Sequence, residues 1–324
     1  MHKEEITLAR YIMKRILQAI PLLIVISIIC FALIQLAPFD VIDTIATPDM
    51  APEVKEALKI KYGLDQPAYV QYLNWIRRMV TGNLGYSIVT HQSVAFDLAA
   101  RIPNTILLIL PSYLLALLIS IVLGLVAGSK RGGRADRIID TFCSIGMATP
   151  TFWIAMMLVY IFGYRLGIFP ILGMHTLGQD KNLPDLLMHL ILPTIVLTIG
   201  DLPGTVRFVR SSTISQYTED YVMVQKAFGA GRAEILFRHV IKNVLLPVIT
   251  LVGMSLPRLI TGAFITESIF SWPGVGTYFI TAIRSFDYPV IMSVMFFSSV
   301  MVILGNLLAD ICYCLVDPRI QAMR

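Results

Sequence analysis

The sequence predicts an all-α membrane protein with six transmembrane helices. Of its 324 residues, 56% are hydrophobic and only 15% are charged, whereas about a quarter of the residues in an ordinary soluble domain are charged. Several apolar runs reach the roughly 20 residues that a helix needs to cross a bilayer, and buried helices of soluble proteins rarely hold such runs. The basic residues lie between these runs, as membrane orientation requires. A soluble globular protein is therefore excluded.

Six apolar runs define the predicted transmembrane helices. They cover residues 16–37, 106–126, 145–163, 187–200, 244–264 and 290–309. The first run is too long for a signal peptide and no small-x-small cleavage site follows it, so we expect an uncleaved helix. The fourth run is short, and it spans a membrane only if its helix continues past Asp201 toward Arg210.

The distribution of Lys and Arg predicts the orientation. The segments on one side of the predicted helices together hold 16 Lys and Arg residues. These segments are 1–15, 129–137, 206–243 and 315–324. The short loops 165–187 and 269–287 hold only 2 and 1. Because basic residues are enriched in cytoplasmic loops, both termini are predicted to be cytoplasmic.

The connection 39–103 is predicted to lie outside the cell. With 65 residues, it is long enough to be translocated regardless of its charge. Residues 52–62 and 68–80 read as helices, the first with Pro at its start and the second with an apolar stripe at Tyr69, Tyr72, Leu73 and Ile76. The stripe favours an ordered cap over a disordered linker. We therefore divide the chain into 1–103, the first transmembrane helix plus an extracytoplasmic cap, and 104–324, a five-helix core with the loop 206–243.

The loop 206–243 carries a second helical pattern. Thr218 is predicted to cap a helix over 219–228, which Gly229 and Gly231 end by permitting a sharp bend. Glu234 and Arg238 are spaced to pair on the next helix. An apolar face follows on that helix at Ala233, Leu236, Phe237, Val240 and Ile241. The pattern leaves open whether the helix lies on lipid, enters a groove of a partner protein, or packs against neighbouring helix ends.

Specific motifs resemble one family of membrane proteins. The first group comprises Tyr221, Val222, Ala227, Gly229, Arg238, His239, Asn243, Leu245, Leu246 and Pro247. This group resembles the cytoplasmic loop of the dipeptide/oligopeptide/nickel branch of binding-protein-dependent permeases. The interval of 18 from Gly229 to Pro247 fits the wider EAA loop signature. Further matches lie at 15–21, 63–67, 82–87, 267–276, 287–290 and 317–319.

The chain departs from the family pattern at a few positions. Met223-Val224-Gln225 replaces Glu-Ala-Ala of the wider signature, Phe228 stands where a Lys is common, and Phe39 replaces a usual Gly. The resemblance still covers nearly the whole chain.

The resemblance implies a permease subunit of an ATP-driven importer of dipeptides or oligopeptides in the cell membrane. Its implied partners are a second homologous permease, two ATPase subunits, an extracytoplasmic substrate-binding protein, the peptide and membrane lipid. The loop would dock into the ATPase, using Tyr221, Ala227, Gly229, Gly231, Glu234, Arg238, His239, Asn243 and Pro247. Alternatives are a nickel or metal-chelate importer, and an ion-coupled secondary transporter, for which we find neither clear internal repeats nor midplane carboxylates.

The sequence predicts no catalysis and no cofactor in this chain. The stretch from Gly124 to Lys130 has the wrong spacing for a phosphate-binding loop, so ATP and Mg²⁺ would be bound by the partner ATPase subunits. Gly124 and Gly128 instead form a small-xxx-small pair suited to close helix packing. No cluster of His and Cys indicates a metal site, and nucleic acid is disfavoured because the basic residues flank apolar runs.

Two ionisable residues within or near the apolar runs are candidates for the transport pathway or its gating. Arg258 lies in the fifth run, where it could meet a peptide carboxylate or pair with a carboxylate of the partner permease. Glu267 is expected near the outer end of the fifth helix.

Overall fold

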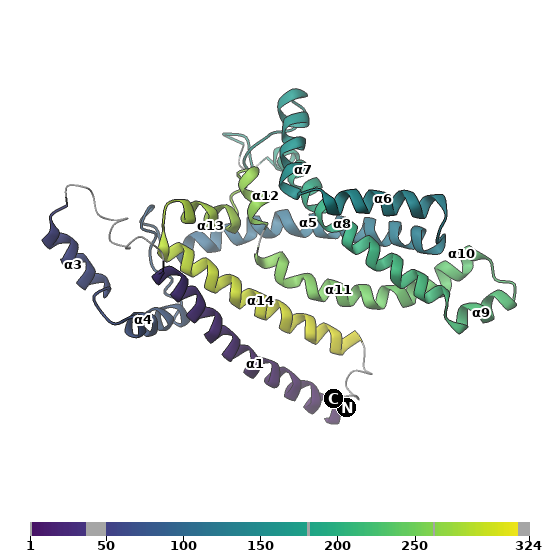
Figure 1. Cartoon of the computed structure of the whole chain (residues 1–324), viewed down its shortest axis with the longest axis horizontal. Helices are drawn as coiled ribbons and strands as arrows, with labels where there is room; N and C mark the ends of the chain where they lie inside the picture. The colour runs from purple at the N-terminus through teal and green to yellow at the C-terminus, as the bar shows by residue number, and fades with distance from the viewer. Residues whose placement is uncertain (1, 37–49, 180–181, 262, 317–324) are drawn as a thin grey trace.

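The structure is a computed structural model that describes residues 2–36, 50–179, 182–261 and 263–316. These residues form helices and connecting loops, and the only β-type pairing among them is an isolated bridge between Tyr86 and Ser93. Figure 1 shows long helices running alongside one another, with shorter helices at both ends of the bundle and along one side of it. The all-α prediction is therefore confirmed for the described chain.

Three described helices are long and apolar enough to cross a membrane. They are α5 (Val94–Ser129), α8 (Leu183–Tyr217) and the Tyr288–Leu308 part of α14 (Tyr288–Val316). The predicted continuation of the fourth run past Asp201 is confirmed, because α8 continues to Tyr217. Two further helices coincide with apolar runs, α1 (His2–Gln35) and α11 (Ile241–Thr261).

The third apolar run is not one straight helix. The structure has α6 (Arg134–Ala148) and then α7 (Thr151–Leu158), which continues as a π-helix (Val159–Arg165), and the two parts meet at an angle of 95°. Thr149 is extended, with φ −96° and ψ 123°, because the ring of Pro150 disfavours helical backbone in the preceding residue. The prediction of a continuous helix over 145–163 is therefore wrong.

Two glycines bring α5 and α8 into close contact. A Cβ atom on Gly124 would lie 2.5 Å from Val209 Cβ, and one on Gly128 would lie 2.5 Å from Thr213 Cβ. Real Cβ atoms do not approach so closely, so both positions require glycine. The predicted role of this pair in helix packing is confirmed.

The two helices predicted after the first apolar run are confirmed with the predicted bounds. They are α3 (Pro52–Tyr62) and α4 (Ala68–Val80). Gly63 ends α3 with φ +70°, a left-handed conformation that glycine adopts without steric cost. Residues 37–49, including Phe39, lie outside the described residues.

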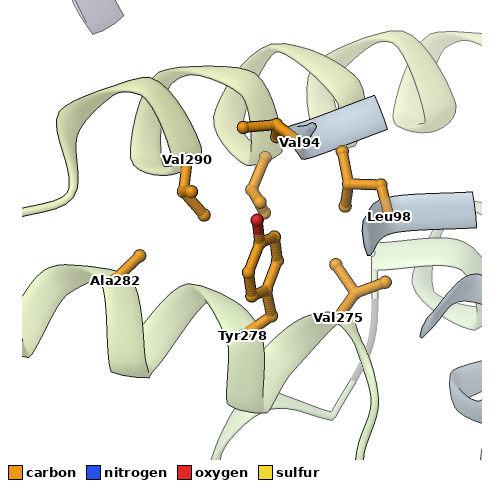
Figure 2. Packing of buried hydrophobic residues seen from close by; sticks show 7 residues of the cluster. Val94, Leu98, Val275, Tyr278, Ala282 and Val290 are labelled. Atoms are coloured by element: carbon orange, nitrogen blue, oxygen red, sulfur yellow. The ribbon is translucent and has the colours of Figure 1, made fainter. Parts of the chain in front are cut away.

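A buried apolar cluster joins three elements at the end of the bundle near α3 and α4. Figure 2 shows Tyr278 pointing between neighbouring helices, toward Val94 and Leu98 of α5. Tyr278 belongs to α13 (Val275–Arg284), and its hydroxyl donates to Asp97 Oδ2 at 3.1 Å. Burial raises the pKa of the Tyr278 hydroxyl, and the nearby Asp97 carboxylate acts in the same direction. This hydroxyl therefore stays protonated and keeps α13 bonded to α5.

Candidate functional site

The candidate site is the segment between α8 and α11, residues 218–240, which we call the α8–α11 loop. It contains α9 (Asp220–Ala227), the single turn α10 (Arg232–Glu234) and a π-helix over Ile235–Val240. Figure 1 shows α9 and α10 at the end of the molecule opposite to α3 and α13.

The start of α9 differs from the prediction. Thr218 does not cap this helix; it ends α8, and its hydroxyl donates to the carbonyl of Ser215 at 2.7 Å. Glu219 occupies the N-cap position without a side-chain cap hydrogen bond. Thr218 has helical backbone, with φ −95° and ψ −6°, whereas Glu219 has the extended backbone of an N-cap residue, with φ −73° and ψ 149°.

The turn after α9 depends on one glycine. Gly229 has φ +82°, a region that non-glycine residues rarely adopt. The N–H of Ala230 donates to the carbonyl of Gln225 at 3.0 Å, which satisfies a carbonyl at the end of the helix. Gly231 has φ −70°, and a Cβ atom added there would have no neighbouring atom within 4 Å, so the predicted need for glycine at this position is wrong.

The apolar face predicted after the turn is only partly correct. Ala233 and Phe237 are exposed, whereas Ile235, which the prediction did not include, is 1% exposed. The reason is the π-helix, in which hydrogen bonds connect residues five apart. Ile235 and Val240 are five positions apart, and both are buried. In an α-helix two such residues would point in different directions, so the α-helical repeat does not predict that they share a face.

The buried face fixes the loop to the bundle. Val222 of α9 is fully buried and belongs to one cluster with Ile235 and Val240 of the π-helix. The same cluster includes Leu125 of α5 and Val209 of α8. The loop therefore rests on the ends of two long helices rather than projecting from them.

The other predicted loop residues lie around this base. Tyr221 donates from its hydroxyl to Gln216 Oε1 at 2.9 Å, and the predicted pair of Glu234 with Arg238 is confirmed at 2.7 Å. Ala227 is exposed at the end of α9. The remaining three predicted residues are His239, Asn243 and Pro247, which lie in the π-helix and the first turns of α11.

Four large apolar side chains of the loop face away from the base. Phe228 is 83% exposed and Phe237 is 68% exposed. We call these two residues, together with Met223 and Val224, the apolar tip. A group of exposed apolar side chains beside charged residues is typical of a protein interaction site. The sequence interpretation missed this surface, although the replacement of a usual Lys by Phe228 was a signal.

The two candidate pathway residues lie away from the loop. Arg258 lies in α11, and its side chain is outside the part of the chain that the structure describes. Glu267, expected near the outer end of the fifth helix, lies in the short helix α12 (Phe264–Ile269), which comes soon after the end of α11 in the sequence. Figure 1 shows α12 well separated from α9 and α10.

Glu267 is fully buried in a set of hydrogen bonds. Its carboxyl oxygens accept from Thr105 Oγ1 at 2.9 Å and from the backbone N–H groups of Gly276 and Thr277 at 2.7 and 3.3 Å. Thr105 belongs to α5, and Gly276 and Thr277 belong to α13. The Glu267 carboxyl group therefore links α12 to both of these helices. These partners were not foreseen from the sequence.

Comparison with known proteins gives the family. Residues 120–322 match the family described as binding-protein-dependent transport system inner membrane component, and residues 8–109 match the N-terminal part of such components. The chain is 41% identical to the oligopeptide transport system permease protein AppB of Bacillus subtilis, over 97% of this chain and 100% of that protein.

Two further relatives match along almost their whole length. The di/tripeptide transport system permease protein DppB of Pseudomonas aeruginosa is 34% identical over 97% of this chain and 99% of its own. The glutathione transport system permease protein GsiC of Escherichia coli is 32% identical over 96% of this chain and 98% of its own length. The chain therefore belongs to the family of inner-membrane components of binding-protein-dependent transport systems.

Proposed function

We propose that this chain is one permease subunit of an ATP-driven importer of short peptides, and that the α8–α11 loop is where the ATPase acts on it. The family supplies the membrane component of such systems. The relatives named above are permeases for oligopeptides, di- and tripeptides, and glutathione. Since all of these cargoes are peptides, they support a peptide substrate over nickel or a metal chelate.

The observation that carries the coupling role is the apolar tip above a buried base. Met223, Val224, Phe228 and Phe237 offer exposed apolar area that can enter a groove on a partner. The base packs on α5 and α8, and the π-helix runs directly into α11. If the ATPase subunits displaced the tip, the long helices attached to it would therefore move. Closure of the ATPase subunits on ATP would in this way change the side of the membrane to which the pathway is open.

The proposed topology has six crossings, with both termini in the cytoplasm. The crossings are α1, α5, the bent α6–α7 segment, α8, α11 and α14. The distribution of basic residues supports this orientation. It puts the α8–α11 loop on the side where ATP is available and puts α3 and α4 outside the cell. The complete transporter would contain a second permease, two ATPase subunits that bind ATP and Mg²⁺, and an external substrate-binding protein.

The individual site residues take different proposed roles. Gly229 shapes the turn, Arg238 and Glu234 lie exposed beside the apolar tip, and Tyr221 fixes α9 to the end of α8. Arg258 remains a proposed pathway residue. Glu267 is proposed to hold the segment 264–278 against α5, so that the outer end of the bundle moves as one unit.

The experiment that tests the coupling role is copurification of ATPase subunits with a tagged permease. Phe228→Asp puts a charge on the apolar tip, and Val54→Asp, at an exposed apolar position on α3, is the control. A central aromatic contact contributes at least about 2 kcal/mol, so retention of the ATPase should fall more than about tenfold with Phe228→Asp. Equal retention by both variants would contradict the proposal.

A further inference from the structure

The helix α4 packs against α1 within the apolar part of that helix. The hydroxyl groups of Tyr72 and Ser27 are hydrogen-bonded at 2.8 Å, and the rings of Tyr72 and Phe31 lie edge to face with centroids 5.6 Å apart. The ring of Trp75 lies 5.9 Å from that of Phe296 in α14. Two different long helices therefore fix the position of α4.

These contacts give the depth of α4 along the bundle. Ser27 lies eight residues before Gln35, the last residue of α1, and Phe296 lies eight residues after Tyr288, the first residue of α14. At 1.5 Å per residue, both contacts are about 12 Å inside the helix ends. The hydrocarbon core of a bilayer is about 30 Å thick, so each leaflet contributes about 15 Å of it. If α1 and α14 cross the membrane, as proposed above, α4 lies at the depth of one leaflet rather than above it.

A second face of α4 is apolar and unoccupied within the described chain. Tyr69, Leu73 and Val80 are 68%, 57% and 77% exposed. At about 100° per residue, these three positions fall within about 40° of one another around the helix. The face that packs on α1 and α14 instead carries Tyr72, Trp75 and the buried Met79. The helix thus has two apolar faces, and only one of them has a protein partner within the described part of the chain.

The charges of α4 lie at one end. Arg77 and Arg78 are both in its last turn and both exposed. Arginine can extend its charged group from apolar surroundings toward lipid phosphates, and aromatic and basic residues together are typical of helices at the membrane interface. Figure 1 shows α3 beyond the ends of α1 and α14, whereas α4 lies beside the end of α1.

We propose that α4 is an interfacial helix of the outer leaflet. Tyr69, Leu73 and Val80 contact the acyl chains of phospholipids, and Arg77 and Arg78 bind their phosphate groups. This inference rests on the proposed crossings by α1 and α14, but not on the identity of the cargo or on the role of the ATPase.

Photocrosslinking tests the proposal in the assembled transporter, reconstituted in vesicles of phosphatidylethanolamine and phosphatidylglycerol with the substrate-binding protein added. A benzophenone amino acid replaces Leu73, and in matched controls it replaces Val54 of α3 or Asn74, which lies on a polar side of α4. Of these three probe positions, Leu73 is the one that would face acyl chains, so its lipid adduct should exceed that of both controls by about tenfold. If the probe at Leu73 prevents assembly, Tyr69 is the replacement site.

Two outcomes would overturn the proposal: crosslinking of Leu73 mainly to the substrate-binding protein, and a lipid adduct no larger than that of Val54. ATP-driven peptide uptake is measured on the same vesicles. Lipid adducts without uptake would count against the proposed function alone, whereas uptake without lipid adducts would count against the interfacial helix alone.

Discussion

Thr105 of α5 and Glu267 of α12 are hydrogen-bonded at 2.9 Å although they lie 162 positions apart in the sequence. The Thr105 hydroxyl donates to the carboxyl group and at the same time accepts from the backbone N–H of Val275, also at 2.9 Å. One hydroxyl therefore connects a long helix to both ends of the turn between α12 and α13. Both side chains are buried, so the bonds are not exchanged with water.

Replacing Thr105 by Val should destabilise the protein. The change keeps the side-chain shape but leaves Glu267 without one donor and Val275 without its acceptor, and a buried unsatisfied group costs about 1–3 kcal/mol. Thr105→Ser retains the hydroxyl and should restore most of the stability. Thermal unfolding of the purified transporter is the measurement. Equal losses for Val and Ser would show that the hydroxyl has no such role.

Gly276→Ala should also be destabilising. A Cβ atom at this position would lie 2.6 Å from Phe264 Cα and 2.8 Å from Glu267 Oε2. Overpacking in a tight site typically costs about 1–3 kcal/mol. Gly204→Ala is the control, since no atom lies within 4 Å of the added Cβ. The unfolding temperature should fall for Gly276→Ala and stay near the original for Gly204→Ala; the reverse order would be inconsistent with this packing.

Gly229→Val should abolish ATP-driven uptake while the permease still inserts into the membrane. At φ +82°, a side chain costs about 1–2 kcal/mol and a β-branched one more, so the turn would change shape. Gly178 has the same φ of +82° and equally open surroundings, but it lies outside the α8–α11 loop. Gly178→Val controls for backbone strain and should retain uptake. Wild-type uptake by Gly229→Val would remove the loop from the coupling mechanism.

The proposed cargo predicts which molecules compete for uptake. Unlabelled di- and tripeptides should reduce the uptake of a labelled tripeptide by the assembled transporter, whereas nickel chelates should not. The reason is that the named relatives are permeases for peptides of these lengths or longer. Competition by nickel chelates alone would favour the metal branch of the family.

Local sequence signals predicted the local structure well. The bounds of α3 and α4 followed from a proline, a glycine-containing turn and an apolar repeat, all of which act over a few residues. The continuation of α8 past Asp201 followed from the length that a membrane crossing requires. Such features depend on neighbours in the sequence and are therefore accessible without the fold.

Features that depend on distant contacts were not predictable. The π-helix over Ile235–Val240 changes the helical repeat, and no residue in that segment signals the change. As a result, the sequence places Phe237 on the inward face, although it is exposed on the apolar tip. The partners of Glu267 come from α5 and α13, and their approach depends on how the whole bundle packs.

Peptide uptake into vesicles that contain the assembled transporter, measured with and without ATP hydrolysis, tests the central claim most directly. The account predicts accumulation only when the ATPase subunits are present and hydrolyse ATP, with no change when ion gradients are collapsed. Accumulation of peptide by this chain alone, without any nucleotide hydrolysis, would contradict it.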